Sequence, residues 1–171
     1  MMKAVWILGT VVLTTCFAAT AAGRLDINLQ NMQTAYVAIA GASVSVTMTN
    51  TGDRPIELPA SYVSDVDKGG RLQTNLFKVL QEDGSTVDYR GIYVRNVRGS
   101  TPSLVLIPGQ SIVKTIDLSL SYQIMPGRKY SVAVHPFVRY REQQESKSKT
   151  NSADMTSLKT ATSNIIEITP R

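Results

Sequence analysis

His135 is the only histidine in the 171-residue chain, and Cys16 is the only cysteine. Zinc and copper sites usually need several His and Cys ligands, so the sequence predicts neither metal. As a general base, His135 would need a nucleophile on an exposed turn and a third group to orient its ring. The chain has no Gly-x-Ser-x-Gly motif. We therefore interpret His135 as a strand-end histidine with a local hydrogen bond.

The thirteen acidic residues show no spacing typical of carboxylate chemistry. Asp65, Asp67 and Asp83 are the formal candidates for a calcium site, but their spacing matches no calcium loop of known mechanism. No pair of carboxylates stands out as a glycosidase pair. The motif H-E-x-x-H, a phosphate-binding loop and a dinucleotide fingerprint are all absent from the sequence. We predict no catalytic residue, metal or cofactor, and no enzyme activity.

Arginines and tyrosines gather in one short stretch, at Tyr89, Arg90, Tyr93, Arg95 and Arg98. Both residue types are favoured in protein interfaces. An ordinary sheet face, with long side chains covering apolar neighbours, is the alternative interpretation. We take Tyr93, Arg95 and Arg98 as the candidate contacts with a protein partner.

The formal net charge of +5 is mild, and the basic residues are scattered along the chain. Nucleic-acid binding needs a concentrated basic footprint, which the sequence lacks. The charge favours at most an acidic protein partner.

Residues 1–22 have the features of a secretory signal peptide. Lys3 gives a positive end, an uncharged apolar run follows, and Ala19-Thr20-Ala21 fits the A-x-A cleavage pattern. We expect cleavage after Ala21 or Ala22. The apolar run approaches the length that spans a bilayer, so an uncleaved anchor is the alternative.

Thr15 precedes Cys16, where a bacterial lipoprotein box usually has Gly, Ala or Ser, so lipid anchoring through Cys16 is disfavoured. We expect an exported protein, periplasmic or extracellular. Its mature chain would contain no cysteine, and its stability would come from an ordinary apolar core instead of disulfides.

Alternating apolar and polar residues predict short strands from residue 24 onward, with Leu25, Ile27 and Leu29 on one face of the first. Turn signals separate the strands at Asn50-Thr51-Gly52-Asp53, Asp83-Gly84, Pro108-Gly109 and Pro126-Gly127. This pattern predicts an all-β fold, an immunoglobulin-like antiparallel β-sandwich of about seven to eight strands. We assign residues 23–171 to that single domain.

Several local predictions are more specific. We expect Gly52 to supply a positive φ, a return strand over 86–97 bent at Gly91, and a polar connection over 60–74. A strand over 130–134 should extend past Pro136 to residue 140. A flexible or weakly helical polar loop should follow over 141–160, and a final strand over 164–169.

Ordered landmarks in the chain resemble the N-terminal, propeptide-like domain of deuterolysin-type zinc endopeptidases, the aspzincins, which include the peptidyl-Lys enzymes. The landmarks are Val46-Thr47-Met48-Thr49-Asn50-Thr51-Gly52-Asp53-Arg54-Pro55-Ile56-Glu57-Leu58, Leu76-Phe77-Lys78-Val79, Tyr89-Arg90-Gly91-Ile92-Tyr93-Val94, Leu106-Ile107-Pro108-Gly109-Gln110-Ser111, Asp117-Leu118-Ser119-Leu120-Ser121-Tyr122 and Asn164-Ile165-Ile166-Glu167-Ile168. The family's catalytic zinc motif belongs to a second domain, so no catalytic residue is carried over. The connections 60–74 and 141–160 depart from the family's pattern.

The resemblance implies an exported, non-catalytic binding domain that serves a secreted zinc metallopeptidase as inhibitor or folding helper. The alternative is a structural or adhesive β-sandwich module of the cell envelope, which would pair through an exposed strand edge. Both hypotheses expect a protein partner, no nucleic acid, no small-molecule cofactor and membrane contact only through the signal segment.

Overall fold

The computed structural model describes residues 22–32, 41–64, 66–93, 103–136, 138–143 and 158–171. Within these ranges the chain forms ten strands: β1 (Leu25–Asn31), β2 (Ser43–Asn50), β3 (Ile56–Pro59), β4 (Phe77–Gln81), β5 (Ser103–Leu106), β6 (Ser111–Asp117), β7 (Tyr130–Val134), β8 (Arg139–Glu142), β9 (Lys159–Thr160) and β10 (Ile166–Ile168). The predicted signal segment lies almost wholly outside the described residues.

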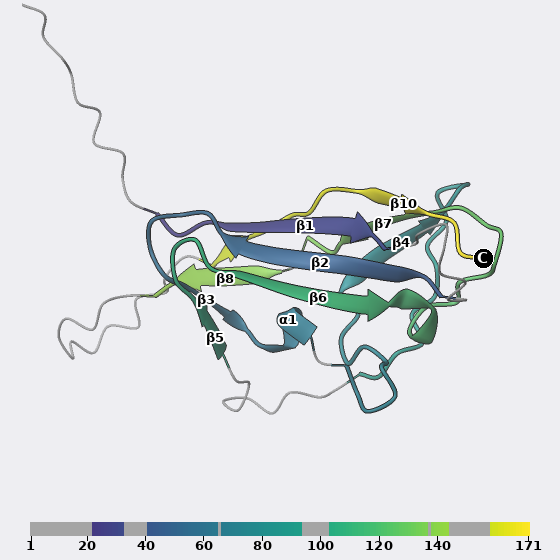
Figure 1. Cartoon of the computed structure of the whole chain (residues 1–171), viewed down its shortest axis with the longest axis horizontal. Helices are drawn as coiled ribbons and strands as arrows, with labels where there is room; N and C mark the ends of the chain where they lie inside the picture. The colour runs from purple at the N-terminus through teal and green to yellow at the C-terminus, as the bar shows by residue number, and fades with distance from the viewer. Residues whose placement is uncertain (1–21, 33–40, 65, 94–102, 137, 144–157) are drawn as a thin grey trace, which may run out of the picture.

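The strands form antiparallel sheets in the orders β1-β2-β6, β10-β7-β4 and β5-β3-β8-β9. In Figure 1 the first sheet runs across the view, with β3, β5 and β8 toward one end and β4, β7 and β10 toward the other. Asn164 joins β1 to the segment before β10, because its side chain accepts from Leu29 N (2.7 Å) and donates to Leu29 O (2.9 Å).

The alternation read from the sequence sets which side chains enter the core. Leu25, Ile27 and Leu29 of β1 are buried, and the residues between them are exposed. Apolar side chains from all three sheets join one buried cluster whose largest members include Phe77, Leu29, Ile56, Leu58, Leu106, Leu118 and Ile168. The prediction of an all-β antiparallel sandwich is therefore confirmed.

Asn50 connects two of the predicted turns. Its side chain is fully buried and donates to the carbonyl oxygens of Arg54 (2.8 Å) and Leu106 (2.9 Å). Its backbone carbonyl accepts from Gly109 N (2.8 Å), and Gly109 has the positive φ of +78° that was expected after Pro108. Two of the landmark segments therefore meet at this residue.

The reason given for Gly52 was wrong. Gly52 is not among the glycines with positive φ. Instead, the backbone of residues 22–24 passes so close that a Cβ on Gly52 would meet Ala22 O and lie 2.5 Å from Arg24 N. Glycine is needed here for close packing of two backbones, not for an unusual dihedral angle.

The predicted return strand over 86–97 is wrong as far as it is described. Gly84 (φ +82°) makes the expected turn, and Val87 N donates to Val79 O (2.9 Å). Beyond that point residues 88–90 leave β4 and pair with 121–123, so only isolated bridges form. Positions 94–97 lie outside the described residues.

The predicted strand through Pro136 is also wrong, because the chain changes sheets there. β7 pairs with β4 and β10, whereas β8 pairs with β3 and β9. Proline has no N–H for a strand ladder, and the chain turns at Pro136. This separation, together with the two-residue β9, raises the strand count above the predicted seven to eight.

The connections are more structured than expected. The 60–74 segment holds a single helical turn, α1 (Ser61–Ser64), and buries Leu72. β8 and β9 occupy the two ends of the 141–160 segment, whose positions 144–157 are not described. The final strand, β10, is shorter than predicted, because Asn164 bonds through its side chain to the backbone of Leu29 instead of joining the strand. In the part of the chain that the structure covers, no helix has the length and apolarity to cross a membrane.

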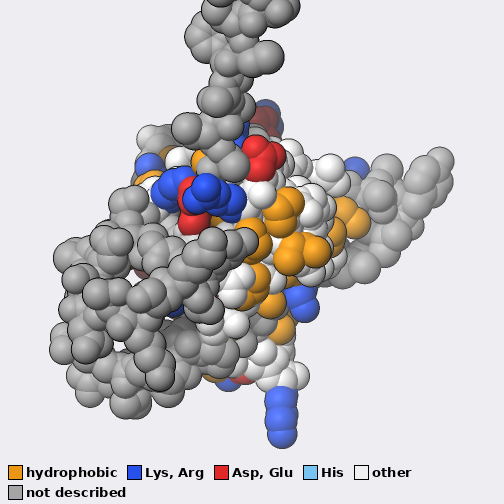
Figure 2. Space-filling model, turned by 90° about the vertical axis from the view of Figure 1, so that its left-hand side faces the viewer, with side chains coloured by type: hydrophobic (Ala, Val, Ile, Leu, Met, Phe, Trp, Pro, Cys, Tyr) orange, Lys and Arg blue, Asp and Glu red, His pale blue; other side chains and the backbone are white. Residues whose placement is uncertain are grey.

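Charged side chains gather at the end of the sandwich where β1 begins and β8 ends. Glu142 forms ion pairs with Lys159 and Arg54 and accepts from Gly23 N (3.0 Å). Figure 2 faces this end and shows hydrophobic side chains in the middle of the face, beside clustered basic and acidic ones.

Candidate functional site

Tyr93 is the one predicted partner contact that the structure describes; Arg95 and Arg98 lie outside the described residues. The Tyr93 side chain is 74% exposed. Its ring packs edge-on against that of Tyr89, with centroids 5.1 Å apart. An aromatic ring held in place yet largely solvent-exposed is a suitable contact for a protein partner.

Tyr89 anchors Tyr93 to the core. Its ring lies 5.3 Å from that of Tyr122, which is buried. The Tyr89 hydroxyl is directed at the carbonyl oxygens of Leu72 (2.6 Å) and Ile92 (3.0 Å). Burial raises the pKa of Tyr89 to about 12, so this hydroxyl remains a donor at neutral pH. The three rings thus form a stack that runs from the core to the surface.

A short backbone pairing places this stack next to a second segment. Arg90 N donates to Ser121 O (2.7 Å), and Gln123 N donates to Asp88 O (3.1 Å). The Arg90 guanidinium also donates to Gln123 Oε1 (2.6 Å). Sequence reasoning missed this pairing, since residues 88–90 and 121–123 are far apart in the chain and neither forms a regular strand.

The landmark Asp117-Leu118-Ser119-Leu120-Ser121-Tyr122 explains how the second segment is shaped. Asp117 accepts from Ser119 N (3.0 Å) and caps the 3-10 helix Leu118–Leu120. The Tyr122 hydroxyl accepts from Phe77 N (3.0 Å) on β4 and donates to Asn75 Oδ1 (2.8 Å). Both residues therefore have structural roles.

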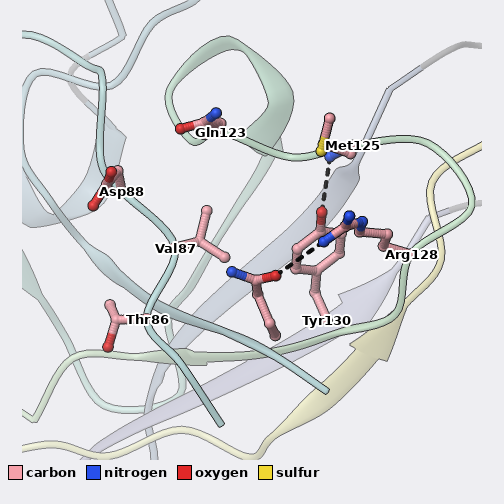
Figure 3. Close-up of a pocket in the computed structure, with 8 residues that line it drawn as sticks. Thr86, Val87, Asp88, Gln123, Met125, Arg128 and Tyr130 are labelled. Carbon is pink, nitrogen blue, oxygen red and sulfur yellow. Dashed lines mark hydrogen bonds between the residues drawn. The ribbon is translucent and has the colours of Figure 1, made fainter. Parts of the chain in front are cut away.

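A pocket of about 230 Å³ opens beside these segments, as Figure 3 shows. It is lined by Gln81, Thr86, Val87, Asp88, Gln123, Met125, Arg128 and Tyr130. Asp88 and Arg128 lie on opposite sides of it, and the Arg128 guanidinium donates to Gln81 Oε1 (3.4 Å). The Tyr130 hydroxyl accepts from Met125 N (2.8 Å). Its small size and polar lining suit a single polar side chain.

We call residues 86–93 and 121–128 together the Tyr93 surface. Besides Tyr93 it presents Met125, which is 50% exposed, and the guanidinium groups of Arg90 and Arg128. Tyrosine, methionine and arginine are the residue types enriched in protein interfaces. The sequence signal for Met125 and Arg128 was weak, because only the fold brings them to the pocket beside Asp88.

The other sequence candidates lie elsewhere. His135 N donates to Leu76 O (2.9 Å), and burial, then the nearby Lys78, lowers the pKa of the His135 imidazole. Asp67 accepts from the backbone N–H groups of Gly69 (2.9 Å) and Arg71 (2.8 Å), within its own turn.

Asp83 likewise accepts from Ser85 N (2.8 Å) in its turn, and Asp65 lies outside the described residues. No cluster of three or more His, Cys, Asp or Glu side chains that could hold a metal ion occurs among the residues the structure places. The structure thus gives no support for the calcium alternative in this part of the chain.

Comparison with known proteins gives one weak similarity. The chain is 25% identical over 116 residues to a protein of Arthroderma gypseum named "Neutral protease 2 homolog", and the match covers 66% of this chain. The chain spans about 30% of the length of that relative. No family model matches the chain.

Among solved structures, the X-ray structure of Northeast Structural Genomics Consortium target SoR45 aligns with a TM-score of 0.39 and 10% identity, over 86% of each chain. The sequence similarity thus relates part of this chain, at low identity, to part of a neutral protease 2 homolog.

Proposed function

We propose that this chain is an exported, non-catalytic β-sandwich that binds a secreted zinc metallopeptidase and acts as its inhibitor or folding helper. The similarity of part of the chain to the neutral protease 2 homolog supports the link to a peptidase. A domain that accompanies a peptidase, separate from its catalytic part, is consistent with such a partial match. The ordered landmarks read from the sequence point to the same kind of domain.

The Tyr93 surface is the part of the fold that we assign to the peptidase. Tyr93 projects from a stack of three rings, so binding would order little additional side-chain freedom. Met125 lines the pocket near Asp88 and adds an adaptable apolar contact there. The pocket between Asp88 and Arg128 can receive a polar side chain of the partner. These features combine an aromatic anchor with polar contacts at its rim.

Inhibition is tested by adding the purified mature protein to a deuterolysin-type zinc peptidase and following cleavage of a peptide substrate. We expect activity to fall with increasing protein, and Tyr93→Ala to raise the concentration for half-inhibition about tenfold or more. Ile107→Ala is the matched control, because Ile107 is 58% exposed and lies outside the Tyr93 surface.

The folding role is tested in the same system by refolding the denatured peptidase with and without the protein. A higher yield of active enzyme, again reduced by Tyr93→Ala, would identify a folding helper. If the protein neither inhibits nor assists refolding, the proposal fails. Self-association of the protein, or binding to envelope components, would then favour the structural or adhesive alternative.

A further inference from the structure

A second hollow lies on the outer face of the β5-β3-β8-β9 sheet. Its volume is about 450 Å³, within the range of small-molecule and peptide sites. It is lined by Glu57, Leu58, Pro59, Tyr62, Ser103, Arg139, Tyr140, Arg141 and Leu158. Side chains alternate along a strand, so Arg139 and Arg141 of β8 share the face opposite to the buried Tyr140. The strand pairing of Glu57 with Arg141 places both on that face.

The charges in this hollow do not cancel. Arg141 Nε donates to Glu57 Oε2 (2.8 Å), and hydrogen bonds from Arg141 and then Ser103 hold the pKa of Glu57 below its ordinary value. Glu57 therefore stays ionised and neutralises Arg141. Arg139 is exposed and forms no ion pair within the described ranges of the chain. The hollow thus offers one guanidinium to an anion.

Apolar groups line the same hollow as this guanidinium. Leu158 is 59% exposed, and Tyr62 of α1 packs partly against the core. Pro59 ends β3 at the same hollow and, opposite Ser103, completes the lining. A ligand that combines a carboxylate with an adjacent apolar group would match both features, because guanidinium and carboxylate form paired, charge-assisted hydrogen bonds.

We propose that this hollow binds the free C-terminal end of an extended peptide whose last side chain is apolar. Arg139 binds the terminal carboxylate, and Leu158 and Tyr62 contact the last side chain. The Glu57 carboxylate and the Ser103 hydroxyl oxygen line the same hollow and can accept hydrogen bonds from peptide N–H groups. An acyl chain would need a longer apolar channel, and this mixed polar and apolar lining fits a peptide better. The inference is independent of the peptidase proposal, since it uses a different set of residues.

The test is an NMR chemical-shift titration of the full mature protein with acetyl-Ala-Ala-Leu as its free acid and as its C-terminal amide. We expect the acid to bind at least tenfold more tightly than the amide, and Arg139→Gln to remove that difference. Arg24→Gln removes an equal charge at an exposed position outside the hollow and should leave binding unchanged. Leu158→Asp should weaken binding of the acid at least tenfold.

Folding of each variant is checked by its amide spectrum, and all three altered side chains are exposed, so the fold should persist. The proposal is overturned if the acid and the amide bind equally, if the Arg139→Gln variant binds the acid as tightly as the unaltered protein, or if no binding occurs at millimolar peptide. Dodecanoate is titrated in parallel. If it binds as tightly as the peptide acid at the same residues, the hollow is an acyl-carboxylate site and the assignment to peptides is wrong.

Discussion

Asn50 shows how much of the fold depends on single polar side chains. It lies at the end of β2, fully buried, and its amide group bonds to the backbone of three other residues: Gly52, Arg54 and Leu106. A buried carbonyl that loses its donor costs free energy, because water cannot replace the bond. Asn50 therefore acts as a structural link between the turn that follows β2 and the end of β5.

Asn50→Ala is expected to lower the free energy of unfolding by roughly 2–3 kcal/mol, since it leaves Leu106 O without its buried donor. Urea denaturation followed by circular dichroism measures the change. Thr51→Ala, at the exposed neighbouring position, is the control and should change stability little. A loss below about 0.5 kcal/mol for Asn50→Ala would show that the amide bonds contribute less than proposed.

His135 is the only histidine in the sequence, so its titration leads to a prediction about how stability depends on pH. Burial and Lys78 lower its pKa in the folded state below the ordinary value of 6.5. The unfolded state therefore takes up a proton at higher pH than the folded state does, and the free energy of unfolding falls as pH decreases through 6.5. Measured between pH 7.5 and 5.5, this slope should flatten in His135→Gln; an unchanged slope would contradict the assignment.

At the scale of secondary-structure elements, two backbone segments come so close together at Gly52 that only glycine fits between them. Gly52 packs against residues 22–24 with no room for a Cβ, whereas Gly84 has open space and a positive φ of +82°. Both positions carry glycine, but for different physical reasons. The difference predicts different costs for the same substitution.

Gly84→Ala is expected to cost about 1–2 kcal/mol, the strain of a left-handed alanine. Gly52→Ala is expected to cost more, because two backbone segments must separate to admit the methyl group. Thermal unfolding of the two variants ranks them directly. A smaller loss for Gly52→Ala than for Gly84→Ala would mean that residues 22–24 move aside easily.

The sequence predicted those elements whose signals are local. The alternation in β1 and the turns at Gly84 and Gly109 were confirmed, because side-chain period and turn chemistry act over a few residues. The change of sheet at Pro136 and the pairing of Tyr89 with Tyr122 could not be read in the same way. Both depend on which distant segment offers a partner.

The candidate sites also combine features with local sequence signals and features that depend on distant segments. Tyr93, chosen from an Arg- and Tyr-rich stretch as a partner contact, is 74% exposed, and its contact with a partner stays a prediction. Its support by Tyr122, through Tyr89, depends on the pairing of 88–90 with 121–123, which no local sequence signal indicates. The hollow at Arg139 was not predicted, because position 139 was expected to continue β7 instead of facing β3.

At the scale of the whole molecule, one apolar core supports the two surfaces that we propose as binding sites. The Tyr93 surface lies on irregular segments tied to β4 by Tyr122, and the hollow at Arg139 lies on regular strands. Tyr122 ties the first set of segments to β4, and strand pairing holds the second. We therefore propose that the protein is a scaffold for binding and that a zinc peptidase is its partner at the Tyr93 surface.

Isothermal titration calorimetry of a deuterolysin-type zinc peptidase with the purified mature protein measures this binding. We expect a one-to-one complex, weakened about tenfold or more by Tyr93→Ala and unchanged by Ile107→Ala. The absence of binding at micromolar concentrations, or binding that Tyr93→Ala leaves intact, would contradict it.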